Sequence, residues 1–213
     1  MLEPVVTITD YIISIQCLYM SVYVFRKMAS IPWVLLFGSL GAASLVGGTV
    51  HGFLPDEASL AYAILWRLVL IFIGVAALAE WYVGCAFLKN MRVTSIIRKL
   101  AIFQFFVFSY VIIIHSQSFV LEAVNCLPPS LFIIVVFCRG YAVTDNKNFI
   151  FGASGVILSL FGSFIQAEGV SLHHVYFNHN ALYHVIEFFS IYLLFIMARW
   201  TLSSARVRFK MLW

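Results

Sequence analysis

The sequence predicts an all-α, polytopic membrane protein with seven transmembrane helices. Of its 213 residues, 63% are hydrophobic and only 10% are Asp, Glu, Lys or Arg. A soluble domain carries about 25% charged residues, so this chain has too few of them to cover a surface in water. Its apolar residues form runs of about 20, the length that a helix needs to cross a bilayer. The net charge of +4 comes from basic clusters between these runs and gives no indication of nucleic acid binding.

Seven apolar runs are the predicted spans, and charged residues or prolines bound several of them. The first run ends at Arg26 and Lys27, and the second lies between Pro32 and Pro55. Because Met1–Val6 lacks a basic segment and a cleavage site, the first run is expected to remain as a span. In order, the predicted spans are Val5–Phe25, Trp33–Leu54, Leu60–Leu88, Arg98–Gln117, Phe119–Cys138, Phe149–Ala167 and Asn178–Arg199.

The fifth run is the hardest to delimit because it contains Pro128 and Pro129. A proline inside a helix removes a hydrogen bond and breaks or kinks the helix. The fifth span therefore either covers Phe119–Cys138 or begins at Pro128 and ends at Val143. Both alternatives give the same topology.

The distribution of basic residues predicts an outer N-terminus and a cytoplasmic C-terminus. Cytoplasmic loops of membrane proteins are enriched in Lys and Arg. Here the basic residues follow the first, third, fifth and seventh spans: Arg26, Lys27, Lys89, Arg92, Arg98, Lys99, Arg139, Lys147, Arg199, Arg206, Arg208 and Lys210. The other loops carry Asp56, Glu57, Glu122 and Glu168. Arg67 lies just inside the third span and is expected to pair with Asp10, Asp56 or Glu57, with binding of a lipid headgroup as the alternative.

The chain has no linker and no clear repeat, so residues 1–202 are expected to form one seven-helix transmembrane domain. Residues 203–213 form a basic and aromatic tail in which Lys or Arg alternates with apolar residues. Such a tail is typical of a segment that lies on the membrane surface, here anchored by Trp213. Docking of a partner protein is the alternative for this tail.

In this topology all six histidines lie near the outer face: His51, His115, His173, His174, His179 and His184. Ionisable side chains at membrane depth are costly and are functional candidates by default, which favours His51 and His184. His115, His173 and His174 are better interpreted as interfacial residues with backbone hydrogen bonds. For His51 and His184 the same structural interpretation is the alternative.

Helical spacing brings several polar residues to the same side of their spans. At about 100° per residue, Asn180, His184 and Glu187 share one face. Ser44 lies on the same stripe of the second span as His51, and Asp10 lies in the outer half of the first span. Since the first, second and seventh spans of a sequential bundle are usually neighbours, we expect these residues to converge on one outer pocket.

Such a set of side chains predicts a zinc site. Imidazole is a good zinc ligand, and catalytic zinc commonly takes three protein ligands and a water. The candidate metal ligands are His51, His184, His179 and Asn180. The candidate catalytic residues are Asp10, Glu187 and Ser44, with a carboxylate as general base.

Other polar and sulfur-containing residues have separate interpretations. Glu80 lies in the cytoplasmic half of the third span and should face a polar partner, for which Gln104 is the candidate, or a proton path. The cysteines Cys17, Cys85, Cys126 and Cys138 form no CxxC pair and are interpreted as small buried hydrophobic residues.

The seven spans, the serine and histidine of the second span and the sequence NALYH at 180–184 resemble the CREST membrane-hydrolase superfamily of alkaline ceramidases and progestin and adipoQ receptors. In that superfamily a zinc ion is held by a histidine of the second span and an HxxxH pair of the seventh. The resemblance implies that His51 and His184 are two of these ligands. Asn180 occupies the position of the first histidine of the pair, and Gly47 occupies the position of the superfamily serine. The superfamily aspartate of the third span has no counterpart in this sequence.

The leading functional hypothesis is therefore a zinc-dependent hydrolase of lipid amides or esters, in which Asp10 or Glu187 accepts a proton from bound water. One alternative is a non-catalytic subunit of a larger membrane complex that binds a partner or a tetrapyrrole through its histidines. A further alternative is a small proton-coupled transporter that uses Glu80. Membrane lipid is the expected partner in the first case, and other subunits of the complex in the second.

Overall fold

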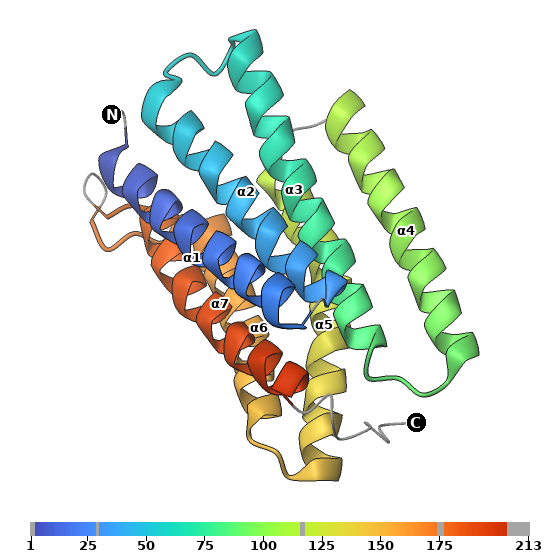
Figure 1. The fold of residues 1–213 in the computed structure, drawn as a ribbon. Helices are drawn as coiled ribbons and strands as arrows, with labels where there is room; N and C mark the ends of the chain where they lie inside the picture. Colours follow the sequence, from blue (N-terminus) through green and yellow to red (C-terminus); the bar gives the residue numbers. More distant parts are fainter. Residues whose placement is uncertain (1–2, 29, 116–117, 174–176, 204–213) are drawn as a thin grey trace.

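The computed structural model describes residues 3–28, 30–115, 118–173 and 177–203, which form seven α-helices (Figure 1). All seven are long and apolar enough to cross a membrane, as predicted. Their bounds are α1 Pro4–Met28, α2 Ile31–Phe53, α3 Leu60–Cys85, α4 Met91–Ile114, α5 Phe119–Thr144, α6 Asn148–Ala167 and α7 His179–Ser203. His174 and residues 204–213 of the predicted tail lie outside the described residues.

Side-chain caps fix where three of the helices begin. Ser59, Asn90 and Ser118 each precede a helix and accept hydrogen bonds from its first backbone N–H groups. The cap at Asn90 starts α4 at Met91 rather than at the predicted Arg98. At the other end of the same connection, α3 ends at Cys85 and not at the predicted Leu88.

Helix α5 runs through both prolines without interruption. It begins at Phe119, as the first alternative predicted, and ends at Thr144, one residue beyond the end that the second alternative predicted. Pro129 has no N–H to offer the carbonyl oxygen of Asn125, four residues earlier. The side chain of Gln104 from α4 donates to that oxygen at 2.7 Å. Gln104 also accepts a hydrogen bond of 3.1 Å from the Trp81 indole of α3. A neighbouring helix thus satisfies a backbone group that a proline leaves free, as is common within membranes.

The helices form a bundle in which α1 packs between α2 and α7 (Figure 1). Helix α2 also packs on α3, α6 packs between α5 and α7, and α4 lies at the periphery against α3. The contact between α1 and α2 is close because α2 presents glycines to it. A Cβ atom at Gly48 would lie 3.0 Å from Asp10 Cβ and 3.0 Å from Tyr11 Cε1. Small residues allow such close approach of helices.

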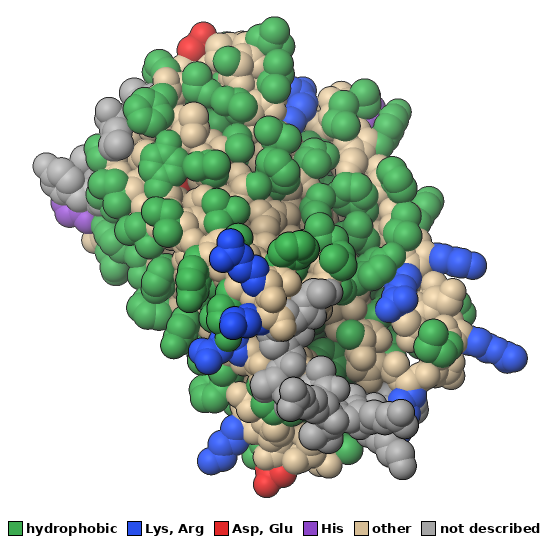
Figure 2. Space-filling view, viewed as in Figure 1, with side chains coloured by type: hydrophobic (Ala, Val, Ile, Leu, Met, Phe, Trp, Pro, Cys, Tyr) green, Lys and Arg blue, Asp and Glu red, His purple; other side chains and the backbone are tan. Residues whose placement is uncertain are grey.

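The two ends of the bundle interior differ in polarity. At the end where α7 finishes, Phe37, Phe87, Phe137 and Phe149 are packed edge to face or tilted and are almost completely buried. At the end where α1 begins, which we call the N-terminal end, the interior holds His51, His184 and several carboxylates. The outer surface is covered by large apolar side chains, and Lys and Arg gather toward the C-terminal end (Figure 2).

Two further predictions concern single residues. All four cysteines are free, but they are not all buried: Cys126 is half-buried and Cys138 is exposed, because it lies on the outward face of α5. Arg67 was expected to pair with an acidic residue. In the structure it donates hydrogen bonds to the carbonyl oxygens of Ala63 and Ile112, at 3.1 and 3.3 Å.

Candidate functional site

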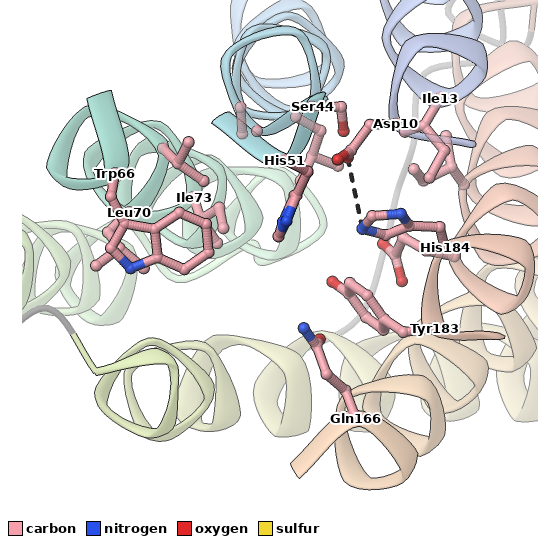
Figure 3. A pocket seen from close by; sticks show the side chains of 16 residues that line it. Asp10, Ile13, Ser44, His51, Trp66, Leu70, Ile73, Gln166, Tyr183 and His184 are labelled. Atoms are coloured by element: carbon pink, nitrogen blue, oxygen red, sulfur yellow. Dashed lines mark ion pairs between the residues drawn. The ribbon is translucent and has the colours of Figure 1, made fainter. Parts of the chain in front are cut away.

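A small polar cavity lies between α1, α2, α3, α6 and α7, toward the N-terminal end of the bundle. We call it the central chamber. It has a volume of about 80 Å³, which is enough for a few water molecules. Figure 3 shows polar side chains from different helices pointing toward it. Its polar lining residues are Asp10, Ser44, His51, Gln166, Tyr183, His184 and Glu187.

Asp10 and His184 form a buried pair on one wall of the central chamber (Figure 3). The His184 Nε2 atom lies 3.4 Å from Asp10 Oδ1, and the two side chains are only 9% and 6% exposed. On the other side of the ring, His184 Nδ1 lies 3.0 Å from the hydroxyl oxygen of Thr9. That hydroxyl also donates to backbone carbonyl oxygens of its own helix, which favours the tautomer in which it accepts from Nδ1–H. In the neutral ring of that tautomer Nε2 is an acceptor, so the proton of its contact with Oδ1 comes from the Asp10 carboxyl group.

The second oxygen of Asp10, Oδ2, is buried and has no hydrogen-bond partner among the described residues. A Cβ atom at Gly47 would make an ordinary contact of 3.5 Å with it, so the carboxylate lies beside this glycine of α2. A buried carboxylate oxygen without a partner is energetically unfavourable. Oδ2 is therefore an unused acceptor in the wall of the central chamber.

His51 stands at the boundary between the central chamber and a second cavity. Its Nδ1 atom lies 3.1 Å from Glu3 Oε2, and its ring meets Trp66 edge to face. The second cavity, which we call the N-terminal basin, has a volume of about 560 Å³ and also contains His51, Trp66 and Gln166 in its lining. His51, Trp66 and Gln166 thus line both the N-terminal basin and the central chamber.

The third cavity, which we call the lateral chamber, shares Tyr183 and Glu187 with the central chamber. Three carboxylates line it, and each accepts one hydrogen bond from a neighbour. Ser130 donates to Glu80 at 3.0 Å, Ser159 to Glu187 at 2.8 Å and Cys126 to Glu122 at 3.1 Å. Glu80 thus has a polar partner and faces a cavity, but that partner is Ser130 rather than the predicted Gln104.

The residues proposed from the sequence fall into two groups. The central chamber brings together Asp10, Ser44, His51, His184 and Glu187. His179 and Asn180 do not line it and belong to the N-terminal basin. The remaining described histidines are peripheral: His115 is exposed at the end of α4, and His173 is exposed in the loop before α7.

The predicted zinc ligands are not assembled into a metal site. Within the described ranges, no group of three or more His, Cys, Asp and Glu residues could hold a metal ion. Both ring nitrogens of His184 already face protein side chains, and Nδ1 of His51 faces Glu3. A structural zinc or catalytic zinc needs at least three protein ligands.

Sequence analysis missed Thr9, Glu3 and Glu122 as members of these sites. Thr9 gave no signal of its own, since only the tertiary contact between α1 and α7 brings it to His184. Glu122 was assigned to a loop, whereas it lies in the first turn of α5 and is 5% exposed. The serine cap at Ser118 and the spacing of Glu122 and Cys126 by one turn were the available signals.

The sequence matches a family of unknown function, DUF6962, over residues 5–202. The chain belongs to this family. The matched region contains the whole central chamber and nearly all of the seven helices. Comparisons with curated proteins and with solved structures give no match.

Proposed function

We propose that the protein is an integral membrane hydrolase that cleaves an ester or amide bond of a membrane lipid. The observation that carries this proposal is the buried Asp10–His184 pair, whose unpartnered Oδ2 atom lies beside a water-sized chamber. A positioned acid–base group of this kind contributes about 10²–10⁴-fold to a reaction rate.

The arrangement of the three cavities supports a reaction between water and a lipid. The N-terminal basin is lined by polar residues and shares His51 with the central chamber. The lateral chamber shares Tyr183 and Glu187 with the central chamber, and its wall includes Val124 and Phe164, which are exposed on the apolar surface. In the predicted orientation, water enters from the outer side and the lipid enters from the bilayer.

The proposed reaction uses the pair to move one proton. Asp10 accepts a proton from a water molecule at Oδ2 and passes its Oδ1 proton to His184 Nε2, which then carries the positive charge. At the same time the water oxygen forms a bond with the carbonyl carbon, and the electron pair of the C=O bond moves to the carbonyl oxygen. The pair returns the proton to the leaving oxygen or nitrogen as its bond to the carbonyl carbon breaks. Ser44 and the Tyr183 hydroxyl are the candidate donors to the carbonyl oxygen, where negative charge develops.

Zinc does not fit the described arrangement, although the superfamily resemblance implies it. His184 has no ring nitrogen that points away from protein partners, and His179 and Asn180 lie in a different cavity. No step of the proposed reaction passes through a metal. His51 acts instead at the water entrance, where Glu3 holds its ring.

The alternative functions have less support. A proton-coupled transporter needs a polar path to both sides, but the C-terminal half of the bundle is filled by Phe37, Phe87 and Phe137. The central chamber, which His51 and His184 both line, is at about 80 Å³ too small for a tetrapyrrole. In a hydrolase, both the carboxylate–imidazole pair and the cavities beside it would have a role.

The experiment is turnover by purified protein in lipid nanodiscs with a panel of fluorogenic lipid esters and amides. We expect wild-type protein to cleave at least one class of substrate, and Asp10→Asn to be slower by about 10²-fold or more. Asp145→Asn is the matched control because Asp145 is exposed at the end of α5. Equal turnover by wild-type protein and Asp10→Asn would rule out this role for the pair.

A further inference from the structure

An apolar groove lies on the side of the bundle between α4 and α5. We call it the α4–α5 groove. It has a volume of about 390 Å³, within the range of about 300–1,000 Å³ that is typical of ligand pockets. It shares no lining residue with the central chamber, the N-terminal basin or the lateral chamber. Its lining residues are Leu88, Asn90, Val93, Ile97, Phe132, Val135 and Val136.

The packing of the helices leaves this groove open. Helices α4 and α5 both pack on α3, and Gln104 links them by donating to the carbonyl and side-chain oxygens of Asn125, at 2.7 and 2.9 Å. The groove lies between this link and the start of α4, which stands at the periphery of the bundle (Figure 1). Its α5 wall is fixed because Phe132 packs on Trp81 and against Gly84 of α3, where a Cβ atom would lie 2.9 Å from Phe132 Cδ1.

The lining of the groove favours hydrocarbon. Asn90 is the one polar residue among its described lining residues, and Asn90 Oδ1 already accepts from the backbone N–H groups of Arg92 and Val93, at 3.0 and 3.2 Å. Val93 and Val135 are 44% and 58% exposed, so the groove opens on the apolar surface of the bundle. An acyl chain in this groove would bury apolar surface on both helices.

Positive charge lies at the mouth of the groove. Lys89 and Arg92 are exposed, and each is adjacent in sequence to residues that line the groove. Neither takes part in the salt bridges found among the described residues, and the sequence from residue 81 to residue 121 contains no Asp or Glu. The predicted orientation places this end of the bundle in the cytoplasm. Basic pockets between membrane-spanning helices on that side bind anionic lipid head groups.

We propose that the α4–α5 groove binds one acyl chain of an anionic phospholipid whose phosphate lies at Lys89 and Arg92. The chain extends along Val93 and Val135 toward the middle of the bilayer. The two basic side chains donate charge-assisted hydrogen bonds to the phosphate, and their charge favours an anionic head group over a zwitterionic one. The lipid fills the space between α4 and α5 and thereby holds the peripheral α4 in place. This site goes beyond the proposed hydrolysis and does not depend on it.

The test is photo-crosslinking of the full chain in phosphatidylcholine nanodiscs that contain a small fraction of a lipid probe. The probe is phosphatidylglycerol or phosphatidylcholine, each with the same diazirine-bearing acyl chain. We expect the phosphatidylglycerol probe to label the first two turns of α4 and the second half of α5 several times more strongly, as mapped by mass spectrometry. Equal labelling of these segments by the two probes, or labelling of other helices only, would overturn the proposal.

A pair of double variants tests the head-group half of the site. Lys89→Gln with Arg92→Gln should reduce labelling by the phosphatidylglycerol probe about tenfold or more, because each basic residue near the surface attracts anionic lipid. Arg26→Gln with Lys27→Gln removes two exposed charges that follow another predicted cytoplasmic end, that of α1, and is the matched control. It should label as wild type. An equal loss in both double variants would indicate general attraction to the membrane surface and would overturn the site.

A second pair of variants tests the hydrocarbon half. Val135→Trp should fill the groove and reduce labelling with both charges intact, and because Val135 is 58% exposed the core is unchanged. Leu131→Trp, at a position of α5 that is 51% exposed and does not line the groove, should label as wild type. Unchanged labelling in Val135→Trp would overturn the placement of the chain. Turnover is not measured here, so this result and that for Asp10 are independent.

Discussion

At the scale of single residues, Thr9 orients the imidazole ring of His184. The Thr9 hydroxyl donates to carbonyl oxygens of α1 and lies 3.0 Å from His184 Nδ1, which favours a proton on Nδ1. Nε2 is then an acceptor that faces Asp10. Thr9, which no sequence motif singles out, is therefore proposed as a positioning residue for the pair.

We predict that Thr9→Val lowers both stability and turnover. The valine has a similar shape but leaves the buried Nδ1–H without an acceptor, which costs about 1–3 kcal/mol in the free energy of unfolding. Thr9→Ser keeps the acceptor and should retain both properties. Thermal unfolding and lipid hydrolysis of the two variants measure this difference. Wild-type behaviour of Thr9→Val would show that Nδ1 has another partner.

At the scale of elements, the glycines of α2 control how closely α1 approaches. Gly48 and Gly47 are adjacent in sequence but differ in their surroundings. A Cβ at Gly48 would be 3.0 Å from Tyr11, whereas a Cβ at Gly47 would make only ordinary contacts of 3.5 Å or more with Asp10. The position of Asp10 thus depends on one glycine much more than on the other.

We predict that Gly48→Ala destabilises the protein more than Gly47→Ala. Overpacking of this kind typically costs about 1–3 kcal/mol, and the shift of α1 should also move Asp10 away from His184. Gly47→Ala should remain within about 1 kcal/mol of wild type, since its methyl group meets no close atom. Thermal unfolding of Gly48→Ala and Gly47→Ala in nanodiscs measures the difference in stability between the two variants. Equal stability of the two variants would contradict the close packing at Gly48.

The continuity of α5 gives a prediction at the same scale. Gln104→Leu removes the donor to the Asn125 carbonyl oxygen that Pro129 leaves free, and we expect a loss of about 1–3 kcal/mol. In a Pro129→Ala background the new N–H can bond that oxygen within the helix. The effect of Gln104→Leu should then be smaller, although Trp81 still loses its acceptor. A double-mutant cycle on unfolding measures the coupling, and strictly additive effects would contradict it.

The number of helices could be predicted from the sequence because each apolar run is long enough to span a bilayer. The path of α5 could not, since Gln104 of α4 and Asn125 of α5 are brought together only by the tertiary structure, in which both helices pack on α3. Similarly, helical phase brought Asn180 and His184 to one face, but α7 begins at His179, so Asn180 lies at the level of the N-terminal basin. Contacts between helices decide which polar residues share a cavity, and a single sequence does not contain them.

At the scale of the whole molecule, the basic loops predict an outer N-terminus. Glu168 and Lys147 are exposed residues at opposite ends of α6 and make a matched pair for labelling. In intact cells, Glu168→Cys should react with a membrane-impermeant maleimide, whereas Lys147→Cys should react only after permeabilisation. The native cysteines are replaced by alanine or serine for this measurement. The reverse labelling pattern would invert the topology and the side from which water enters.

Hydrolysis at the Asp10–His184 pair is tested most directly with heavy-oxygen water. Wild-type protein in nanodiscs is incubated with the lipid esters and amides in this solvent, and the released fatty acid is analysed by mass spectrometry. We predict that the fatty acid carries one heavy oxygen and that its formation falls by about 10²-fold or more in Asp10→Asn. Release of unlabelled acid, or equal release by wild-type protein and Asp10→Asn, would contradict water activation by the pair.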